Sequence, residues 1–186
     1  MANENIKVLS DEYLLEGCRK RDNRCREAVY NKYATDLYQY ALRYASNEEE
    51  AEDVLQESFL VIFDRIGQLR EVEKLLPWMR SIVIREALKQ YRKSLKRWQR
   101  EIPLEENMLE SETAPLPYHE TDYRTLLQLI QKLPEGYRMV FNLCEIEGYD
   151  YEEAAKMMDC APVTCRSQLS RAKSKLRQMI QALEKT

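Results

Sequence analysis

Basic side chains in this sequence gather in two stretches, and their most direct chemistry is the binding of phosphate. The segment 77–100 holds eight Lys or Arg residues against Glu86 alone, and the segment 162–186 holds six against Glu184 alone. Between them, the segment 101–122 holds seven acidic residues and no Lys or Arg. The formal net charge of −3 therefore hides two positive patches, and local patches attract polyanions whatever the total. We expect two separate contacts with nucleic acid.

The residue types that usually carry catalysis or bind metals show no such grouping. His119 is the one histidine, and it stands within the acidic segment without a paired nucleophile or acid. The five cysteines form no Cys-x-x-Cys pair, which argues against a zinc site. We therefore expect no enzyme activity, no metal and no cofactor, with the cysteines as reduced packing residues. A redox-sensing role is left open by the sequence but not supported by it.

The composition favours a helical protein with a substantial core. The chain has 186 residues, of which 44% are apolar and 33% charged, and it contains only four glycines. Few β-branched runs and abundant Glu, Lys, Leu and Arg are typical of an all-α fold. No run approaches the roughly 18 apolar residues that a membrane helix needs, and the first residues lack a signal-peptide core. We therefore expect a cytoplasmic protein with no membrane insertion.

Apolar spacing divides the chain into helices on either side of the acidic segment. That segment contains three prolines and little apolar periodicity, which is typical of a linker. We expect an all-α protein of two small helical domains, 1–100 and 123–186, joined by an acidic linker, 101–122. The second domain should be a four-helix unit with a helix-turn-helix. The expected helices span 9–18, 23–45, 48–66, 77–100, 123–132, 135–147, 151–158 and 162–183.

One face of the expected helix 48–66 is apolar and the opposite face is acidic. Apolar residues recur every three or four positions from Ala51 onward, whereas Asp53, Gln56 and Glu57 fall on the other side. An acidic face is either an ordinary solvated surface or a docking surface for a basic protein partner. Spacing alone leaves both interpretations open.

The expected helix 77–100 has a similar two-sided pattern with basic residues. Apolar residues from Ile84 to Trp98 repeat at spacings of three and four, and the cations fall roughly opposite them. A solvated face normally mixes both charge signs, so this one-sided set favours contact with phosphate. The basic stripe is Arg85, Lys89, Arg92 and Lys96, with Lys93, Arg97 and Arg100 beside it.

The expected helices 151–158 and 162–183, joined by a short turn, fit a helix-turn-helix. The first half of the second helix turns small and cationic side chains outward, which suits a major groove about 12 Å wide. Arg can read guanine edges, and Ser or Thr can bind bases or phosphate. The pattern also fits helical hairpins that do not bind DNA. The outward set includes Thr164, Arg166, Ser167, Ser170 and Arg171.

Three motifs, in order along the chain, resemble one known family. Residues 133–176 read LPEGYRMVFNLCEIEGYDYEEAAKMMDCAPVTCRSQLSRAKSKL and are similar to the promoter-reading domain of bacterial extracytoplasmic-function sigma factors. Residues 50–63, EAEDVLQESFLVIF, resemble the core-polymerase-binding helix of that family. Residues 76–94, LPWMRSIVIREALKQYRKS, resemble its helix that opens and holds the promoter −10 element. The ordered set extends over about residues 10–183.

The resemblance implies roles for the first domain. The face with Asp53, Gln56 and Glu57 would dock on the clamp helices of the largest subunit of core RNA polymerase. An unstacked base of the melted −10 strand would be received by Trp78 and the preceding loop, since stacking contributes about 1–3 kcal/mol per base. The strand backbone would be held by Arg80, Arg85, Lys89, Arg92 and Lys93.

The resemblance also implies that the helix-turn-helix reads the −35 element as duplex. The contacts would come from Arg166, Ser167, Ser170 and Arg171, with Thr164 beside them. Backbone N–H groups of Tyr151 and Glu152 would anchor a phosphate. The sequence departs from the family at four positions, which implies a −35 preference of its own. Arg85 replaces an Asn, Asp159 the turn Gly, Ala161 a capping Ser and Val163 a Gly.

The family implies promoter DNA, core RNA polymerase and an anti-sigma factor as partners, without a cofactor. Two other functions fit parts of the sequence. A helix-turn-helix regulator would bind duplex DNA without polymerase, and a helical adaptor would bind proteins and leave its basic faces solvated. A further hypothesis is self-inhibition, in which the acidic linker covers the basic helix 77–100 in the free protein.

Overall fold

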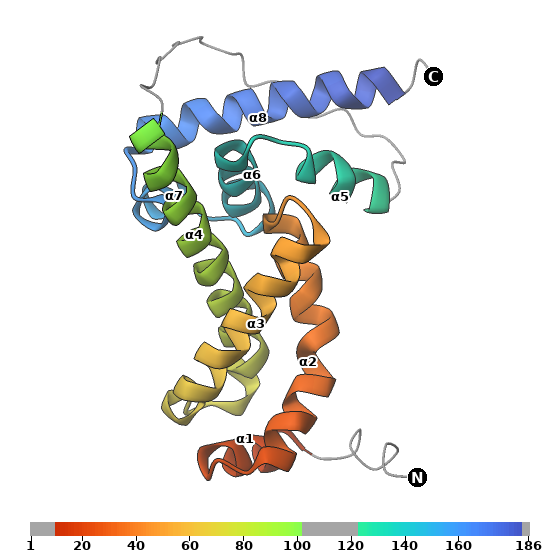
Figure 1. Ribbon diagram of the computed structural model, residues 1–186, viewed down its shortest axis with the longest axis vertical. Helices are drawn as coiled ribbons and strands as arrows, with labels where there is room; N and C mark the ends of the chain where they lie inside the picture. The colour runs from red at the N-terminus through yellow and green to blue at the C-terminus, as the bar shows by residue number, and fades with distance from the viewer. Residues whose placement is uncertain (1–9, 102–122, 184–186) are drawn as a thin grey trace.

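The structure is a computed structural model, and it describes residues 10–101 and 123–183, with the side chains of 96–101 excepted. Every regular element in these two ranges is helical, as expected for an all-α protein (Figure 1). The predicted linker, apart from Glu101, lies outside the described residues, and so does its predicted contact with the basic helix. None of the helices in the described part of the chain is long and apolar enough to cross a membrane.

The first half of the chain forms a bundle of four helices: α1 (Asp11–Arg19), α2 (Asn23–Tyr44), α3 (Glu48–Arg65) and α4 (Leu75–Glu101). Figure 1 shows α2, α3 and α4 packed along one another, with α1 across one end. Polar side chains cap three N-termini as the sequence favours. Ser10, Asp22 and Asn47 accept from backbone N–H groups of Tyr13, Arg24 and Glu50.

The predicted loop before the basic helix is shorter and more ordered than expected. Two 3₁₀ turns, Ile66–Gln68 and Val72–Lys74, lead into α4, which begins at Leu75 instead of at Pro77. Pro77 is tolerated there because the N–H groups of the first helical turn have no partner within the helix. The buried side chain of Leu75 adds a packing reason for the earlier start.

The second half contains α5 (Tyr123–Gln131), α6 (Glu135–Phe141), α7 (Tyr151–Met158) and α8 (Pro162–Leu183). The predicted helix 135–147 is continuous only as far as α6 and then widens into a π turn, Asn142–Ile146. Asn142 is fully buried, and its Nδ2 atom donates to the carbonyl oxygens of Arg43 and Arg138. Such local π geometry is typical where a side chain inserts into the backbone ladder.

The two halves pack against each other through a buried guanidinium. Arg138 of α6 is only 3% exposed, and its Nε atom donates to the carbonyl oxygen of Tyr44 at 2.8 Å. Its Nη1 atom donates to the carbonyl oxygens of Gln131 and Leu133. At the same junction, Gln131 Nε2 donates to Leu42 of α2. The last turn of α2 therefore accepts the hydrogen bonds that hold α5 and α6 against the first half of the chain.

Candidate nucleic-acid and protein interfaces

The acidic face predicted on α3 is exposed along its whole length. Asp53, Gln56 and Glu57 are all exposed, while the opposite side of the helix is buried. Leu60 lies on the same outer face and is 67% exposed, which is unusual for so large an apolar side chain. A strip of carboxylates beside an exposed leucine has the character of a protein-docking surface.

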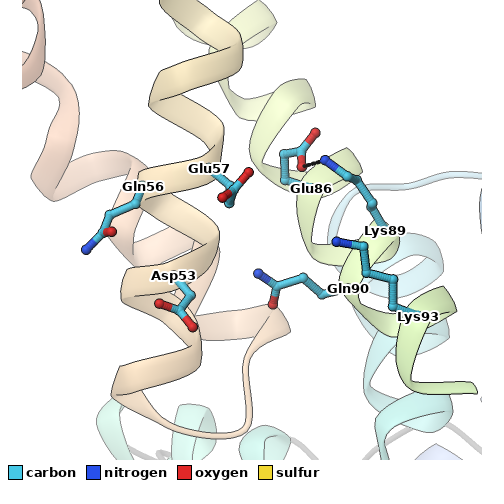
Figure 2. A pocket seen from close by; sticks show the side chains of 7 residues that line it. All are labelled: Asp53, Gln56, Glu57, Glu86, Lys89, Gln90 and Lys93. Carbon is cyan, nitrogen blue, oxygen red and sulfur yellow. Dashed lines mark hydrogen bonds and ion pairs between the residues drawn. The ribbon is translucent and has the colours of Figure 1, made fainter. Parts of the chain in front are cut away.

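A groove of about 260 Å³ separates this acidic face from the basic side of α4 (Figure 2). Asp53, Gln56 and Glu57 line one wall, and Glu86, Lys89, Gln90 and Lys93 line the other. Lys89 Nζ lies 2.6 Å from Glu86 Oε2, as the dashed line in Figure 2 marks. The structure thus places two separately predicted sets of residues next to each other, acids on α3 and cations on α4.

The predicted cations of α4 differ in how freely they face solvent. Arg85, Lys89 and Lys93 are exposed. Arg80 is half-buried, and its guanidinium carbon lies 4.7 Å from the ring centroid of Tyr40 in α2. Trp78 is also half-buried and packs against the core. The exposed three can meet phosphate directly, whereas Arg80 and Trp78 must first leave their packed positions.

Arg92 is turned toward the second half of the chain. Its Nη1 atom donates to the carbonyl oxygen of Met157 at the end of α7 over 2.6 Å. A cavity of about 240 Å³ lies at this contact and is lined by side chains from both halves. Its lining residues are Ser81, Arg85, Leu88, Arg92, Tyr149, Lys156 and Met157.

Capping residues at the helix ends stabilise the helix-turn-helix. Asp150 caps α7 in a reciprocal capping box with Glu153. Asp159 ends α7 with φ 58° and ψ 50°, the left-handed conformation expected for the residue at the turn-glycine position. Pro162 then begins α8, where its missing N–H has no cost. These three residues fix the start of α8 relative to α7.

The predicted duplex-reading residues gather around the start of α7 and the first half of α8. The guanidinium carbon of Arg166, which is exposed, lies 5.4 Å from the ring centroid of Tyr151. Ser167 Oγ donates to the carbonyl oxygen of Thr164 at 3.0 Å. Glu152 is exposed, whereas Thr164, Ser167, Ser170 and Arg171 are half-buried. Tyr151 and Arg166 therefore lie side by side where α7 and α8 meet.

Apart from Arg92, the residues that join the two halves were not predicted as functional from the sequence. Arg43 Nη2 lies 2.9 Å from Glu147 Oε1, and Ser94 Oγ donates to Glu135 Oε2 at 2.6 Å. Arg138, Asn142 and Gln131 also donate hydrogen bonds across this junction. No periodic pattern marks them, because a pairing between distant helices leaves no spacing in the sequence. In the described ranges no group of three His, Cys, Asp or Glu side chains could hold a metal ion.

Comparisons with known proteins agree with this arrangement. Residues 29–98 match the family described as sigma-70 region 2, and residues 123–176 match sigma-70, region 4. The RNA polymerase sigma-H factor of Pseudomonas aeruginosa is 27% identical over 186 residues, covering 93% of this chain and 95% of that protein. The ECF RNA polymerase sigma-E factor of Haemophilus influenzae is 28% identical and covers 94% of this chain and 97% of that protein.

A solved structure shares the fold. The sigma factor RpoE of Bartonella quintana, in complex with the anti-sigma factor NepR, is 22% identical with a TM-score of 0.50. The alignment of the two structures covers 83% of this chain and 96% of the RpoE chain. The two region matches together cover more than half of the sequence, in the order of the helices described above. This chain belongs to the extracytoplasmic-function sigma factors, which direct RNA polymerase to promoters.

Proposed function

We propose that this sigma factor divides its work between an N-terminal domain, 1–100, and a C-terminal domain, 123–186, with residues 101–122 as the tether. The first domain binds core RNA polymerase and captures the melted −10 strand. The second reads the −35 element as duplex. The support is the one-sided distribution of charge, with acids outward on α3 and cations outward on α4 and α8. The protein performs no covalent chemistry and acts in the cytoplasm, where polymerase and chromosome meet.

The polymerase contact is assigned to Asp53, Gln56 and Glu57 on α3. Their exposure and the neighbouring exposed side chain of Leu60 suit a basic helical partner, such as the clamp helices of the largest subunit. Complementary charge speeds and orients such an encounter, and the apolar contact supplies affinity at its centre. The groove beside these residues leaves room for a partner side chain to reach between α3 and α4.

The −10 contact is assigned to α4. Arg85, Lys89 and Lys93 are exposed and ready to meet phosphate, and Arg80 and Arg92 join them after leaving their internal contacts. Trp78, near the first turn of α4, offers a ring on which an unpaired base can stack. Stacking and phosphate contacts together offset part of the free energy needed to open the duplex.

The −35 contact is assigned to the start of α7 and the first half of α8. Arg166 and Arg171 read base edges or phosphates, and Thr164, Ser167 and Ser170 add shorter hydrogen bonds. The free N–H groups around Tyr151 and Glu152 lie at the positive end of α7 and suit a phosphate. The ring of Tyr151 holds Arg166 near this phosphate position.

We also expect an anti-sigma factor to bind this protein and hold it inactive, since RpoE of similar fold is found in complex with the anti-sigma factor NepR. The surface most suited to such a partner is the junction between the two halves. There the cavity beside Arg92 and Lys156 is lined by α4 and by the end of α7, so one ligand could contact both halves of the chain.

The observation that carries the proposal is the exposed acidic face of α3 beside the basic helix α4, in a chain that also carries a supported helix-turn-helix. A run-off transcription assay with core RNA polymerase and genomic promoter fragments tests it. Transcripts that appear only when this chain is added support the proposal. Tight duplex binding by the chain alone, without transcripts, would favour a regulator that acts without polymerase.

A further inference from the structure

Two cysteines meet at the turn of the helix-turn-helix. Cys160 lies in the turn after α7, and Cys165 lies in the first turns of α8. Their sulfur atoms are 3.4 Å apart, so no other atom lies between them. Cys160 is half-buried and Cys165 is fully buried at 0% exposure. A solvent-reachable thiol therefore contacts a protected one at the start of the helix assigned to −35 reading.

We propose that Cys160 and Cys165 form an intramolecular disulfide when the protein meets a hydroperoxide, and that this bond weakens −35 recognition. The first half of this statement depends only on the sulfur geometry. The second half rests on the proposed role of α8 in reading duplex DNA.

The geometry needs only a small rearrangement. A disulfide has a sulfur–sulfur length of about 2.05 Å, so the two atoms must approach by roughly 1.4 Å. The turn allows this approach because the side chain of Cys160 is not enclosed by the core. Its backbone N–H is held by Ala155, and the N–H of Cys165 is held by Ala161. Part of the approach comes from rotation of the Cys160 side chain, and the rest moves the backbone of the turn that these hydrogen bonds hold.

The order of reaction follows from access and acidity. Burial, followed by the hydrogen bond with Cys160, raises the pKa of the Cys165 thiol to about 12. Because Cys165 is buried, a hydroperoxide in solvent reaches Cys160 first, and only a small fraction of Cys165 is thiolate at neutral pH. Cys165 instead serves as the resolving partner, poised against the sulfur that has been oxidised.

The chemistry balances with one hydroperoxide. The sulfur of Cys160 attacks the O–O bond, takes one oxygen as a sulfenic acid, and releases the corresponding alcohol or, from hydrogen peroxide, water. The sulfur of Cys165 then attacks the sulfur of Cys160, and the hydroxyl group leaves with the Cys165 proton as water. Two thiols are oxidised by two electrons, and one peroxide bond is reduced.

The disulfide would act directly on the reading residues. Thr164 and Arg166 flank Cys165 in α8, and Thr164 N–H is bonded to Ala161 within the closed loop. Hydrogen bonds to DNA tolerate donor–acceptor distances of only about 2.7–3.2 Å, so a shift on the order of 1 Å breaks them. Loss of one good base contact corresponds to an affinity about tenfold weaker.

Cys144 supplies a matched control from the same region. It is half-buried, and burial raises the pKa of its thiol to about 11. It contributes to the electrostatic surroundings of Cys165 but is not the sulfur that the structure places against it. Replacement of Cys144 should therefore leave disulfide formation intact, whereas replacement of Cys160 should abolish it.

The experiment uses the purified full-length chain, treated with a small excess of hydrogen peroxide, denatured, and alkylated with N-ethylmaleimide. Trypsin cuts after Lys156 and Arg166 and leaves both cysteines in the peptide 157–166. In the wild type and in Cys144→Ser, this peptide should carry no maleimide. Its mass should be lower by two hydrogen atoms than that of the dithiol peptide, because the disulfide has formed. The peptide from Cys160→Ser carries maleimide on Cys165. A wild-type peptide with both cysteines alkylated, or Cys160 linked to Cys144, would overturn the disulfide.

The functional half is read with holoenzyme on a promoter fragment found by run-off transcription. Oxidation should weaken −35 duplex binding by about tenfold for the wild type and leave Cys160→Ser unchanged. Reduction with dithiothreitol should restore the wild type. A disulfide that forms without a change in affinity would refute the regulatory half. If the reduced holoenzyme binds no promoter, both the proposed function and the regulatory half of the proposal are refuted. The peptide result still shows separately whether the disulfide forms.

Discussion

Arg92 of α4 donates a hydrogen bond to the carbonyl oxygen of Met157 at the end of α7. These residues belong to the two parts of the molecule that are proposed to read different promoter elements. A guanidinium group held on this carbonyl is not free to hold a DNA backbone. The arrangement is therefore a closed one, and Arg92 becomes free for a phosphate only when the contact between α4 and α7 opens.

The ion pair between Arg43 and Glu147 joins the two halves, and its side chains are only 16% and 19% exposed. Glu147→Gln should weaken the junction by about 1.5 kcal/mol, because a largely buried charge-assisted hydrogen bond is lost. Small-angle X-ray scattering of the free protein should then give a larger radius of gyration. Glu71→Gln, which removes the exposed pair with Lys74, is the matched control and should leave the scattering unchanged. Identical curves for both variants would refute this role of Glu147.

Arg138 should be the most costly polar residue to replace. Its guanidinium serves three carbonyl oxygens, and Arg138→Met would leave them buried without a donor. We expect a loss of about 3 kcal/mol in the free energy of unfolding, measured by urea titration with circular dichroism. Arg24→Met, at an exposed position, should change it by less than about 0.5 kcal/mol. Equal stability of the two variants would mean that the junction does not depend on this residue.

The acidic face of α3 is assigned to polymerase. The double charge reversal Asp53→Lys and Glu57→Lys should weaken binding to core polymerase at least about tenfold, through lost attraction and new repulsion. The affinity is measured by fluorescence anisotropy, with labelled protein titrated with core polymerase. Glu12→Lys, exposed on α1 and away from the groove, is the control. Unaltered affinity in the double variant would remove α3 from the polymerase contact.

Arg166 is assigned to the −35 duplex. Arg166→Ala should reduce affinity for the cognate duplex by about 1–3 kcal/mol and relax the sequence preference at one base position. Lys175→Ala, at an exposed position in the second half of α8, should weaken binding equally for all sequences or leave it unchanged. Competition assays with single-base variants of the duplex distinguish these results. A uniform effect of Arg166→Ala across all variants would make Arg166 a phosphate contact only.

Much of the fold was predictable because each helix carries its own signals. Asn47 at a cap and Asp159 at the turn behave as their residue types favour. The junction was not predictable, because Arg92 belongs to a basic stripe that reads as a surface for phosphate. Arg138 likewise resembles a solvated cation in the sequence and is nearly fully buried in the structure. The spacing of apolar residues identifies the buried face of a helix. It does not predict which carbonyl of a distant helix a side chain will bind.

The end of α6 shows a second limit. The apolar pattern of 135–147 predicts one straight helix, and nothing in it signals the π turn at Asn142. The cause is a tertiary contact, since the Asn142 side chain reaches the backbone of Arg43 in α2. Similarly, the contact between Cys160 and Cys165 could not be read from a five-residue separation until the left-handed turn at Asp159 was known.

The most direct test of the whole account is permanganate footprinting of a cognate promoter with reconstituted holoenzyme, which detects unpaired thymines. The wild-type chain should make −10 thymines reactive, and Arg166→Ala should reduce this reactivity only on promoters with a full −35 element. The charge reversal at Asp53 and Glu57 should abolish it on every promoter. Full reactivity with the charge-reversed chain, or none with the wild type, would contradict the claim that α3 brings polymerase to DNA held by α4 and α8.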